Sequence, residues 1–470
     1  MKIKKSRLPI APSVVALLTL LPAGAHAVEA DWVFRGTLAG QADGGRDLGL
    51  DGAKDQQRGY VDATPWVQLQ FSEALSGRVR VRLFAPTDDV LLPGNDNNNL
   101  AASSKAFVGL REAWLDYRGI TDYPGESLRI GRQRIRQSDA AWWDQDIDAA
   151  RWIFDTSLLQ FQLGAARQFD SYRSDGADIP AVQQDRTYGF ATASFEPSPG
   201  VRLGLRAVHA RDDKGAPDVG STLAAGDKRT RGNLSWVGGY IEREAYVAEP
   251  TASLAYWGSA NGLVGKQRRL ASEPLTGTIT ADDKESVRAW AADGGLRLRL
   301  PTAIPVQLGV AYSQSSAAGG GDRSEDYAQT GLQSNYSRYT GTRSLMHRYG
   351  ETFRAELGNL KASTAFVSVR HEAWDASLVF NHLERVRGTA PVTSDGLRVS
   401  PSTDNVTLGN GYDLVIARYF EGKAPVDRLE PGEDLGTSLR LRASMFDPGS
   451  AYGPAAKLDY RVTVEMTLWY

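Results

Sequence analysis

Arginine and aliphatic residues alternate one by one in several short stretches of this sequence. The stretches RVRVRL (residues 78–83), VRLGLRA (201–207), LRLRL (296–300) and LRLRA (439–443) all follow this pattern. A repeat of two residues places successive side chains on opposite faces of a β-strand, whereas a helix would mix them. Each stretch is therefore predicted to be a strand with cations on one face and apolar side chains on the other.

The breaks between strand-like segments are alternately short and long. Pro197–Gly200 and Glu372–Asp375 are short, whereas 87–104 and 313–337 are long and rich in Gly, Asn, Asp and Ser. The last segment, Tyr460–Tyr470, ends on an aromatic residue that continues its apolar face. Counting about 18 segments, we expect an all-β fold, a transmembrane antiparallel up-and-down β-barrel with long extracellular loops and mostly short periplasmic turns.

The position of the arginines relative to the membrane follows from energetics. An arginine facing lipid near the bilayer midplane would cost about 2–4 kcal/mol, so the arginines should face the lumen. About 18 strands enclose more space than side chains fill, which predicts a water-filled pore. Rings of arginine select anions. Alternatively, the same side chains could merely pair with acids in the lumen and form structural ladders. The predicted lumen arginines are Arg78, Arg80, Arg82, Arg202, Arg206, Arg297, Arg299, Arg440, Arg442 and Arg461.

The N-terminus is typical of a secretory signal peptide. Lys2, Lys4, Lys5 and Arg7 precede an apolar run, and Ala25–Ala27 is a small-residue cleavage site. We therefore expect residues 1–27 to be removed and residues 28–470 to form a single outer-membrane barrel domain in a Gram-negative bacterium. The chain has no cysteine, which excludes disulfides and thiolate metal sites.

The alternation breaks down around Gly131. If Leu128 and Ile130 face lipid, the same register would place Arg132 and Arg134 in lipid as well. We therefore expect a bulge at Gly131, or a chain that bends into the lumen and brings Arg134 to a constriction with the acids of the following loop. The alternative is a surface loop.

Three long motifs in these regions carry a family resemblance. They are REAWLDYRGITDYPGESLRIGRQRIRQ (Arg111–Gln137), GTRSLMHRYGETFRAELGNL (Gly341–Leu360) and FDPGSAYGP (Phe446–Pro454). With the rest of the chain from about Arg46 onward, they resemble the alginate export porin family (AlgE). The resemblance implies an 18-stranded barrel whose electropositive constriction passes polymannuronate. Matched motif by motif, it implies the constriction residues Arg111, Glu112, Arg134, Asp144, Asp175, Arg440 and Glu465.

The sequence departs from the family pattern at four other positions. Thr64, Tyr336 and Leu345 stand where the family has arginine, and Asp146 stands where it has asparagine. The constriction is therefore expected to be less positive than in the family. The family also uses one extracellular loop and one periplasmic turn as plugs. The resemblance assigns these roles to Leu91–Phe107 and Glu421–Thr437, and we expect both to gate the pore.

The expected function is an anion-selective outer-membrane porin that exports an acidic exopolysaccharide, alginate. The expected partners are the polysaccharide, the lipid bilayer, the barrel-insertion machinery and a periplasmic scaffold, with no nucleic acid and a monomeric state. An uptake porin for acidic oligosaccharides remains an alternative, because a passive pore fixes no direction.

Two further classes of protein were weighed. An enzyme is disfavoured, because no nucleophile elbow and no metal spacing surround the histidines of the mature chain. A structural or adhesive barrel could bind Ca²⁺ through oxygen-rich loops such as Asn95–Asn97 and Gly320–Asp322, but ordinary surface loops look the same. No cofactor is otherwise expected.

Overall fold

The computed structural model describes residues 28–92, 104–179, 183–212, 219–220, 231–244, 252–272, 279–317, 323–420 and 437–470. The expected signal peptide lies outside these residues, and so do the two candidate calcium loops. Most of the expected plug Leu91–Phe107 and nearly all of Glu421–Thr437 also fall outside them. These expectations therefore stay predictions.

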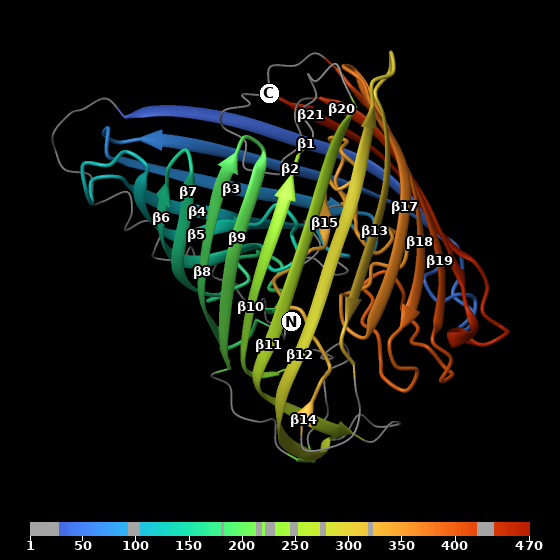
Figure 1. The fold of residues 1–470 in the computed structure, drawn as a ribbon. Coiled ribbons are helices and arrows are strands. Elements are labelled where there is room, and N and C mark those ends of the chain that lie inside the picture. The colour runs from blue at the N-terminus through green and yellow to red at the C-terminus, as the bar shows by residue number, and fades with distance from the viewer. Residues whose placement is uncertain are drawn as a thin grey trace, which may run out of the picture.

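Eighteen long antiparallel strands form one closed barrel (Figure 1). Neighbours in the chain pair with each other, and the ring closes where β1 pairs with β21, from Arg35 opposite Trp469 to Asp43 opposite Arg461. Closure lets the strands satisfy their backbone groups within a bilayer, and it confirms the predicted fold class and strand number. The barrel strands are β1 (Glu29–Asp43), β2 (Gln56–Gln70), β3 (Leu75–Pro86), β4 (Phe107–Tyr117), β5 (Glu126–Arg136), β6 (Asp144–Asp155), β7 (Leu159–Arg167), β8 (Arg186–Ser198), β9 (Val201–Asp212), β10 (Arg231–Arg243), β11 (Ser253–Ser272), β12 (Ile279–Leu300), β13 (Val306–Ser315), β17 (Leu360–Arg370), β18 (Trp374–Arg385), β19 (Thr407–Tyr419), β20 (Ser438–Pro448) and β21 (Asp459–Trp469).

A few short elements lie outside this ring. The two-residue strand β14 (Arg323–Ser324) pairs with β12 in parallel, and β15 (Tyr336–Ser337) pairs with β16 (Met346–His347) as a separate ladder. A single 3-10 turn, η2 (Ser450–Tyr452), follows β20. Among the residues that the structure describes, no helix has the length and apolar character needed to cross a membrane.

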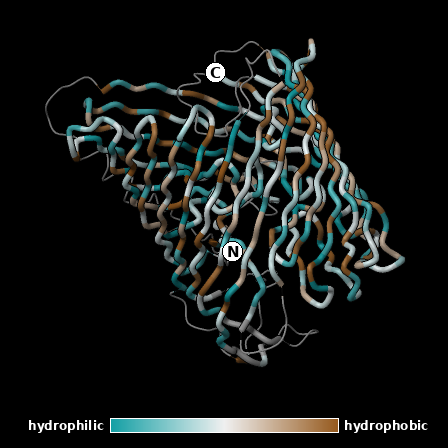
Figure 2. The backbone as a smooth tube through the Cα atoms, viewed as in Figure 1, coloured by the Kyte–Doolittle hydropathy of each residue, from teal (hydrophilic) through white to brown (hydrophobic). Residues whose placement is uncertain are grey.

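Along the wall strands the exposed outer face is largely apolar and the arginines are largely buried, although some apolar residues such as Leu234 and Trp236 of β10 are buried as well. In β3, Leu83 is 44% exposed on the outside, whereas Arg80 and Arg82 are buried. In β12, Leu298 is exposed and Arg297 is buried. Figure 2 shows the same alternation of hydrophobic and hydrophilic residues along the strands. The two-residue repeat thus corresponds to the two faces of the barrel wall.

The β5–β6 hairpin leaves the wall half-way along its length. β4 pairs with β5 only from Ala113 to Tyr117, and β6 pairs with β7 only from Asp148 to Asp155. Beyond these points β5 and β6 pair only with each other, as far as Arg136 opposite Asp144. The change of direction occurs at Gly131, whose φ is 124°. The expected bend into the lumen is therefore present, and we call residues 132–148 the β5–β6 tip.

The chain that follows β7 closes the wall where the β5–β6 tip leaves it. Gly109 of β4 forms a β-bridge with Arg173. The Leu110 N–H donates to the Tyr172 carbonyl at 3.0 Å, and the Ser174 N–H donates to the Val108 carbonyl at 2.8 Å. Backbone pairing along β4 therefore continues without the hairpin.

The long connection between β13 and β17 lies inside the barrel. Its residues 323–359, which we call the internal segment, hydrogen-bond to strands on all sides of the ring. Examples are Trp236 to the Ala328 carbonyl (2.8 Å), Arg297 to the Tyr339 carbonyl (2.9 Å), the Glu351 N–H to Asp413 (3.0 Å) and Arg461 to the Glu351 carbonyl (2.7 Å). Only a chain within the lumen can contact β10, β12, β19 and β21 together.

The internal segment passes down the lumen and back. Near its middle, Arg343 donates to the carbonyls of His371 and Glu372 in the short β17–β18 turn. Near its end, Ala355 bridges Ser394 in the long β18–β19 loop at the other end of the barrel. The segment packs into a hydrophobic cluster that includes Leu332, Tyr349 and Phe353. The interior is thus partly filled by the chain itself.

Candidate functional site

The β5–β6 tip brings three of the expected constriction residues together. Arg134 pairs with Asp144 at 2.6 Å, and Arg111 of β4 pairs with Asp146 at 2.5 Å. Asp146 also lies 3.9 Å from Arg134, so one carboxylate serves two guanidinium groups. Asp146 therefore adds a second negative charge to the cluster beside that of Asp144.

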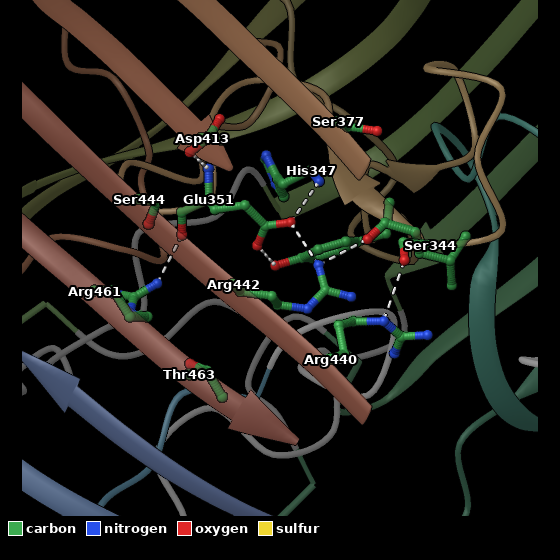
Figure 3. A network of polar contacts seen from close by, with 12 residues as sticks. Ser344, His347, Glu351, Ser377, Asp413, Arg440, Arg442, Ser444, Arg461 and Thr463 are labelled. Carbon is green, nitrogen blue, oxygen red and sulfur yellow. Dashed lines mark hydrogen bonds and ion pairs between the residues drawn. The ribbon is translucent and has the colours of Figure 1, made fainter. Parts of the chain in front are cut away.

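A second cluster joins the internal segment to β20 and β21 (Figure 3). The Glu351 carboxylate accepts from Arg442 at 3.1 Å, from the Tyr336 hydroxyl at 3.1 Å and from the His347 N–H at 3.2 Å. Its backbone carbonyl accepts from Arg461 at 2.7 Å. Glu351 is only 3% exposed. We call this contact the Glu351 junction.

The expected constriction residues Arg440 and Glu465 lie beside the Glu351 junction. Arg442 donates to Glu465 at 3.1 Å, and Arg440 lies 3.9 Å from the same carboxylate. Arg440 also donates to the Ser344 hydroxyl at 3.2 Å. Glu465 is therefore shared by two arginines of β20.

The internal segment links the two clusters. The Ser334 hydroxyl donates to Asp144 of the β5–β6 tip at 2.5 Å. Arg136 donates to the Tyr336 carbonyl at 3.0 Å, and the Tyr336 hydroxyl reaches Glu351. A continuous polar network therefore runs from β5 across the lumen to β20.

The remaining predicted arginines face the interior with different partners. Arg82 pairs with Asp62 through two hydrogen bonds of 2.8 and 2.7 Å, and Arg80 pairs with Glu112 at 3.3 Å. Arg78 lies 4.0 Å from the same Glu112. Arg299 is also buried. Arginine–acid ladders, the alternative weighed from the sequence, are thus present in this part of the wall.

Asp175, the remaining expected constriction residue, is held by partners close to it in sequence. Within the described residues it binds Arg173, at 2.6 and 3.1 Å, and the Ala177 N–H at 3.4 Å. It lies in the stretch that closes the wall beside β4, and Arg173 stacks on Phe107 at 3.9 Å. Asp175 therefore helps to hold that stretch of the wall.

Two of the positions where the resemblance implied arginine lie in the internal segment. Tyr336 and Leu345 are buried in the internal segment, and the Leu345 carbonyl accepts from Arg442. Arg343 pairs with Asp375 at 3.2 Å and stacks on Tyr419. Its charge is therefore neutralised near the β17–β18 turn.

A cavity of about 560 Å³ lies between the inner wall formed by β7–β12, the β5–β6 tip and the internal segment. The predicted lumen arginines Arg202, Arg206 and Arg297 line it together with Arg348. Trp143 and Trp257 are among its aromatic side chains. We call this cavity the chamber.

Two titratable groups outside the wall strands are perturbed by these surroundings. Burial, reinforced by Arg354, Arg348 and Arg461, holds the pKa of His347 well below its usual value, so this side chain is neutral. Burial alone would raise the pKa of Asp139, but Arg206 and the Ala141 N–H outweigh it and the pKa is lowered. Asp139 is therefore a charged partner for Arg206.

Arginine dominates the buried charged residues. Among the described residues, nineteen arginines but no lysines are buried, against fourteen aspartates and glutamates, which leaves an excess of five positive charges. The same part of the chain has no group of three or more His, Asp or Glu side chains that could hold a metal ion.

Sequence reasoning did not find the residues of the internal segment that hold these clusters. Glu351, Arg348 and Arg354 all lie in a stretch without strand periodicity, most of it within a motif that we quoted only as a family resemblance. The sequence feature that could have indicated an internal segment was the absence of alternation in a stretch rich in aromatic and charged residues. Their partners are 55 to 262 residues away in the chain, in β12, β20 and the β3–β4 connection.

Solved structures of similar shape share the barrel fold. The OccAB1 structure from Acinetobacter baumannii has a TM-score of 0.56 and 13% identity, and covers 94% of this chain and 96% of that chain. The OccK8 (OprE) structure from Pseudomonas aeruginosa has a TM-score of 0.57 and 8% identity, with 94% and 98% coverage. At such identities the similarity shows the fold alone.

Relatives at higher identity cover nearly the whole chain. The alginate production protein AlgE of Pseudomonas syringae pv. tomato is 35% identical, over 88% of both chains. The protein of that name from Pseudomonas aeruginosa is also 35% identical, over 89% of this chain and 87% of the relative. That from Azotobacter vinelandii is 32% identical, over 92% of both. A family model described as alginate export matches residues 38–462.

The barrel is closed, its outer face is apolar, and its relatives are alginate production proteins of Gram-negative bacteria. The protein is therefore a channel in the outer membrane of such a bacterium, not an enzyme. The chain belongs to the alginate export family.

Proposed function

We propose that this protein is an anion-selective outer-membrane porin that exports an acidic exopolysaccharide, alginate, through an arginine-lined constriction. The names of its relatives support alginate as the cargo. The observation that carries the selectivity is the excess of buried arginine over buried carboxylate, with no buried lysine among the described residues. An excess of fixed positive charge in a narrow pore attracts anions and repels cations.

Arginine is suited to this task for a chemical reason. The guanidinium group stays charged at all relevant pH values, and its planar fork binds a carboxylate through two parallel hydrogen bonds. It is more weakly hydrated than an ammonium group, so a polymer carboxylate can replace its water at lower cost. Passage requires many binding sites that are individually weak, and resident acids temper each site.

The constriction in this proposal consists of the β5–β6 tip cluster and the β20–β21 cluster. Arg111, Arg134 and Arg440 would contact the polymer, while Glu112, Asp144 and Glu465 hold guanidinium groups in position. Arg134–Asp144 and Arg442–Glu465 are close pairs, at 2.6 and 3.1 Å. Asp175, held by Arg173 beside β4, is the remaining acid of the proposed constriction.

The test is planar-bilayer conductance in a salt gradient. The reversal potential should report preference for anions, and added polymannuronate should reduce the current. Arg134→Gln and Arg440→Gln should each lower the anion preference. Arg118→Gln is the control, because its side chain is 58% exposed beside Asp116, near the β4–β5 turn. A wild-type channel that prefers cations would contradict the proposal.

We also propose that the barrel works as a monomer that receives polymer from a periplasmic scaffold. Exposed apolar residues occur on strands around the ring, such as Leu38 of β1, Leu205 of β9 and Val310 of β13. Lipid can cover such a surface without a second subunit. Cross-linking in native membranes tests both points.

A further inference from the structure

The chamber extends to the end of the barrel that carries the short turns. Its lining includes Arg202, next to the short β8–β9 turn, and Glu242 and Glu244 at the end of β10. Short turns mark the periplasmic end of an outer-membrane barrel, and both ends of the barrel chain lie there too. A polymer arriving from the periplasm would therefore meet the chamber before the constriction.

The chamber has the size and composition of a ligand site. Its volume of about 560 Å³ lies within the usual range of about 300–1,000 Å³ for ligand pockets. Such pockets combine aromatic surface with a few fixed polar groups. Trp143, Tyr240 and Trp257 supply aromatic surface here, and arginines supply the charge.

Each of four arginines in the chamber is paired with its own carboxylate. Arg348 binds Asp293 at 2.5 and 2.7 Å, and Arg206 binds Asp139 at 2.7 Å. The other two pairs are Arg202 with Glu242 at 3.0 Å and Arg297 with Glu244 at 2.6 Å. An incoming uronate would have to displace one of these acids.

Three of the four acids are held by further donors. Asp293 also accepts from Trp257 at 3.1 Å and from the Ser313 hydroxyl at 2.5 Å. The Ala141 N–H donates to Asp139 at 3.1 Å, and the Ser138 hydroxyl donates to Glu242 at 3.0 Å. Displacing any of these acids would break several hydrogen bonds at once.

Glu244 differs from the other three acids. Its side chain is 76% exposed, whereas that of Arg297 is 4% exposed. Among the residues that the structure describes, Arg297 is the only group that binds the Glu244 carboxylate. When it is released, this carboxylate can be hydrated by water, so its displacement costs less than that of a buried acid.

We propose that Arg297 is the first docking point for the polymer, where a uronate carboxylate exchanges with Glu244. This inference rests on the proposed function and names its entrance site. The exchange keeps Arg297 paired at every moment, so no bare charge is left buried. Arg297 itself stays in place, because its other Nη atom donates to the Tyr339 carbonyl at 2.9 Å. The chamber thus offers one replaceable carboxylate on a fixed guanidinium.

The experiment uses mannuronate oligomers added to either side of channels reconstituted in one orientation. Glu244→Gln should tighten block from the periplasmic side by about threefold to tenfold, because Arg297 loses its competitor. Arg297→Gln should weaken that block by about tenfold or more. Neither variant should change block from the extracellular side by as much.

Glu196→Gln is the matched control for the loss of a negative charge. Glu196 lies at the end of β8 near the same turn, accepts from the Gly200 N–H at 2.9 Å and does not line the chamber. Folding of each variant is checked by heat-modifiable migration in gels. Titration calorimetry of the oligomers with the detergent-solubilised barrel gives a second measurement of affinity.

The outcomes separate this inference from the proposed function. If oligomers block the wild-type channel but the Arg297 and Glu244 variants behave like wild type, the docking point is wrong and the porin proposal stands. Equal shifts from both sides would also overturn the docking point. If oligomers block the wild type from neither side, the proposed function itself fails, and the docking point with it.

Discussion

The Glu351 junction and the chamber use the same chemistry with opposite consequences. At the junction one buried carboxylate serves Arg442, Tyr336 and the His347 N–H. In the chamber four arginines each have a carboxylate of their own, and the Glu244 side chain is mostly exposed. The first arrangement holds two parts of the molecule together, and the second can exchange its partner.

The difference teaches that exposure and the number of donors decide what an arginine–carboxylate pair does. A buried carboxylate with several donors cannot leave without stranding charges, and breaking such a pair costs about 3–5 kcal/mol. An exposed carboxylate that leaves its arginine is hydrated by water, so the net cost in free energy is small. Such pairs contribute about 0–1 kcal/mol to stability. Four substitutions test this distinction, with effects expected to decrease from Glu351→Gln to Arg202→Gln.

The largest effect is expected for Glu351→Gln. Loss of the charge leaves Arg442 less well neutralised in the lumen and should destabilise the junction by about 3–5 kcal/mol. The internal segment should then loosen, raising single-channel conductance and lowering the thermal unfolding midpoint. Glu384→Gln is the control, because that side chain is 36% exposed. Wild-type conductance and stability in Glu351→Gln would show that the junction does not hold the segment.

The second effect concerns Gly131→Ala, which should move the β5–β6 tip and so alter one side of the chamber. A Cβ here would lie 2.3 Å from the Ala113 carbonyl oxygen, and the φ of 124° strains any residue other than glycine. We expect a loss of about 1–3 kcal/mol, measured as the unfolding midpoint. Gly189→Ala, where a Cβ would meet nothing within 4 Å, is the control. Equal midpoints in both variants would contradict the proposed strain.

The third effect concerns Asp146→Asn in the β5–β6 tip. Asp146 is shared by Arg111 and Arg134, so removing its charge should raise the anion-to-cation permeability ratio by about twofold. The gain should shrink at high salt because charges are then screened. Asp155→Asn, at the β6–β7 turn, is the control. An unchanged ratio at low salt would place Asp146 outside the ion path.

The smallest effect is expected for the stability of Arg202→Gln. Arg202 and Glu242 are 36% and 25% exposed, so their pair should contribute no more than about 0.5 kcal/mol after allowance for solvent screening. Thermal unfolding should be nearly unchanged. A loss approaching that of Glu351→Gln would erase the distinction between the two regions.

Much of the fold could be predicted from the sequence because a barrel wall is locally encoded. The alternation of Arg297 with Leu296 and Leu298 reports two faces of a strand without any knowledge of its neighbours. The break at Gly131 predicted a bulge or an inward bend, because continuing the register would have put arginine in lipid, and the structure has the bend. The alternation also places Arg440 and Glu465 on the polar, lumen-facing sides of their strands.

The internal contacts could not be predicted in the same way. Glu351 and Arg442 are 91 residues apart, and no sequence pattern around either residue indicates that they pair. The sequence predicted a surface loop for residues 313–337, whereas the structure places most of this stretch in the internal segment. Asp175 was assigned from a family motif alone, and strand periodicity does not indicate its contact with Arg173 beside β4.

By itself, the sequence determined that this chain forms a membrane barrel with arginine on its polar face, because period-two patterning and the cost of charge in lipid act on each strand separately. Only the tertiary structure decided how the lumen is divided. The β5–β6 tip and the internal segment meet wall strands through hydrogen bonds between residues far apart in the chain. Such contacts depend on closure of the whole ring, so no local sequence pattern predicts them.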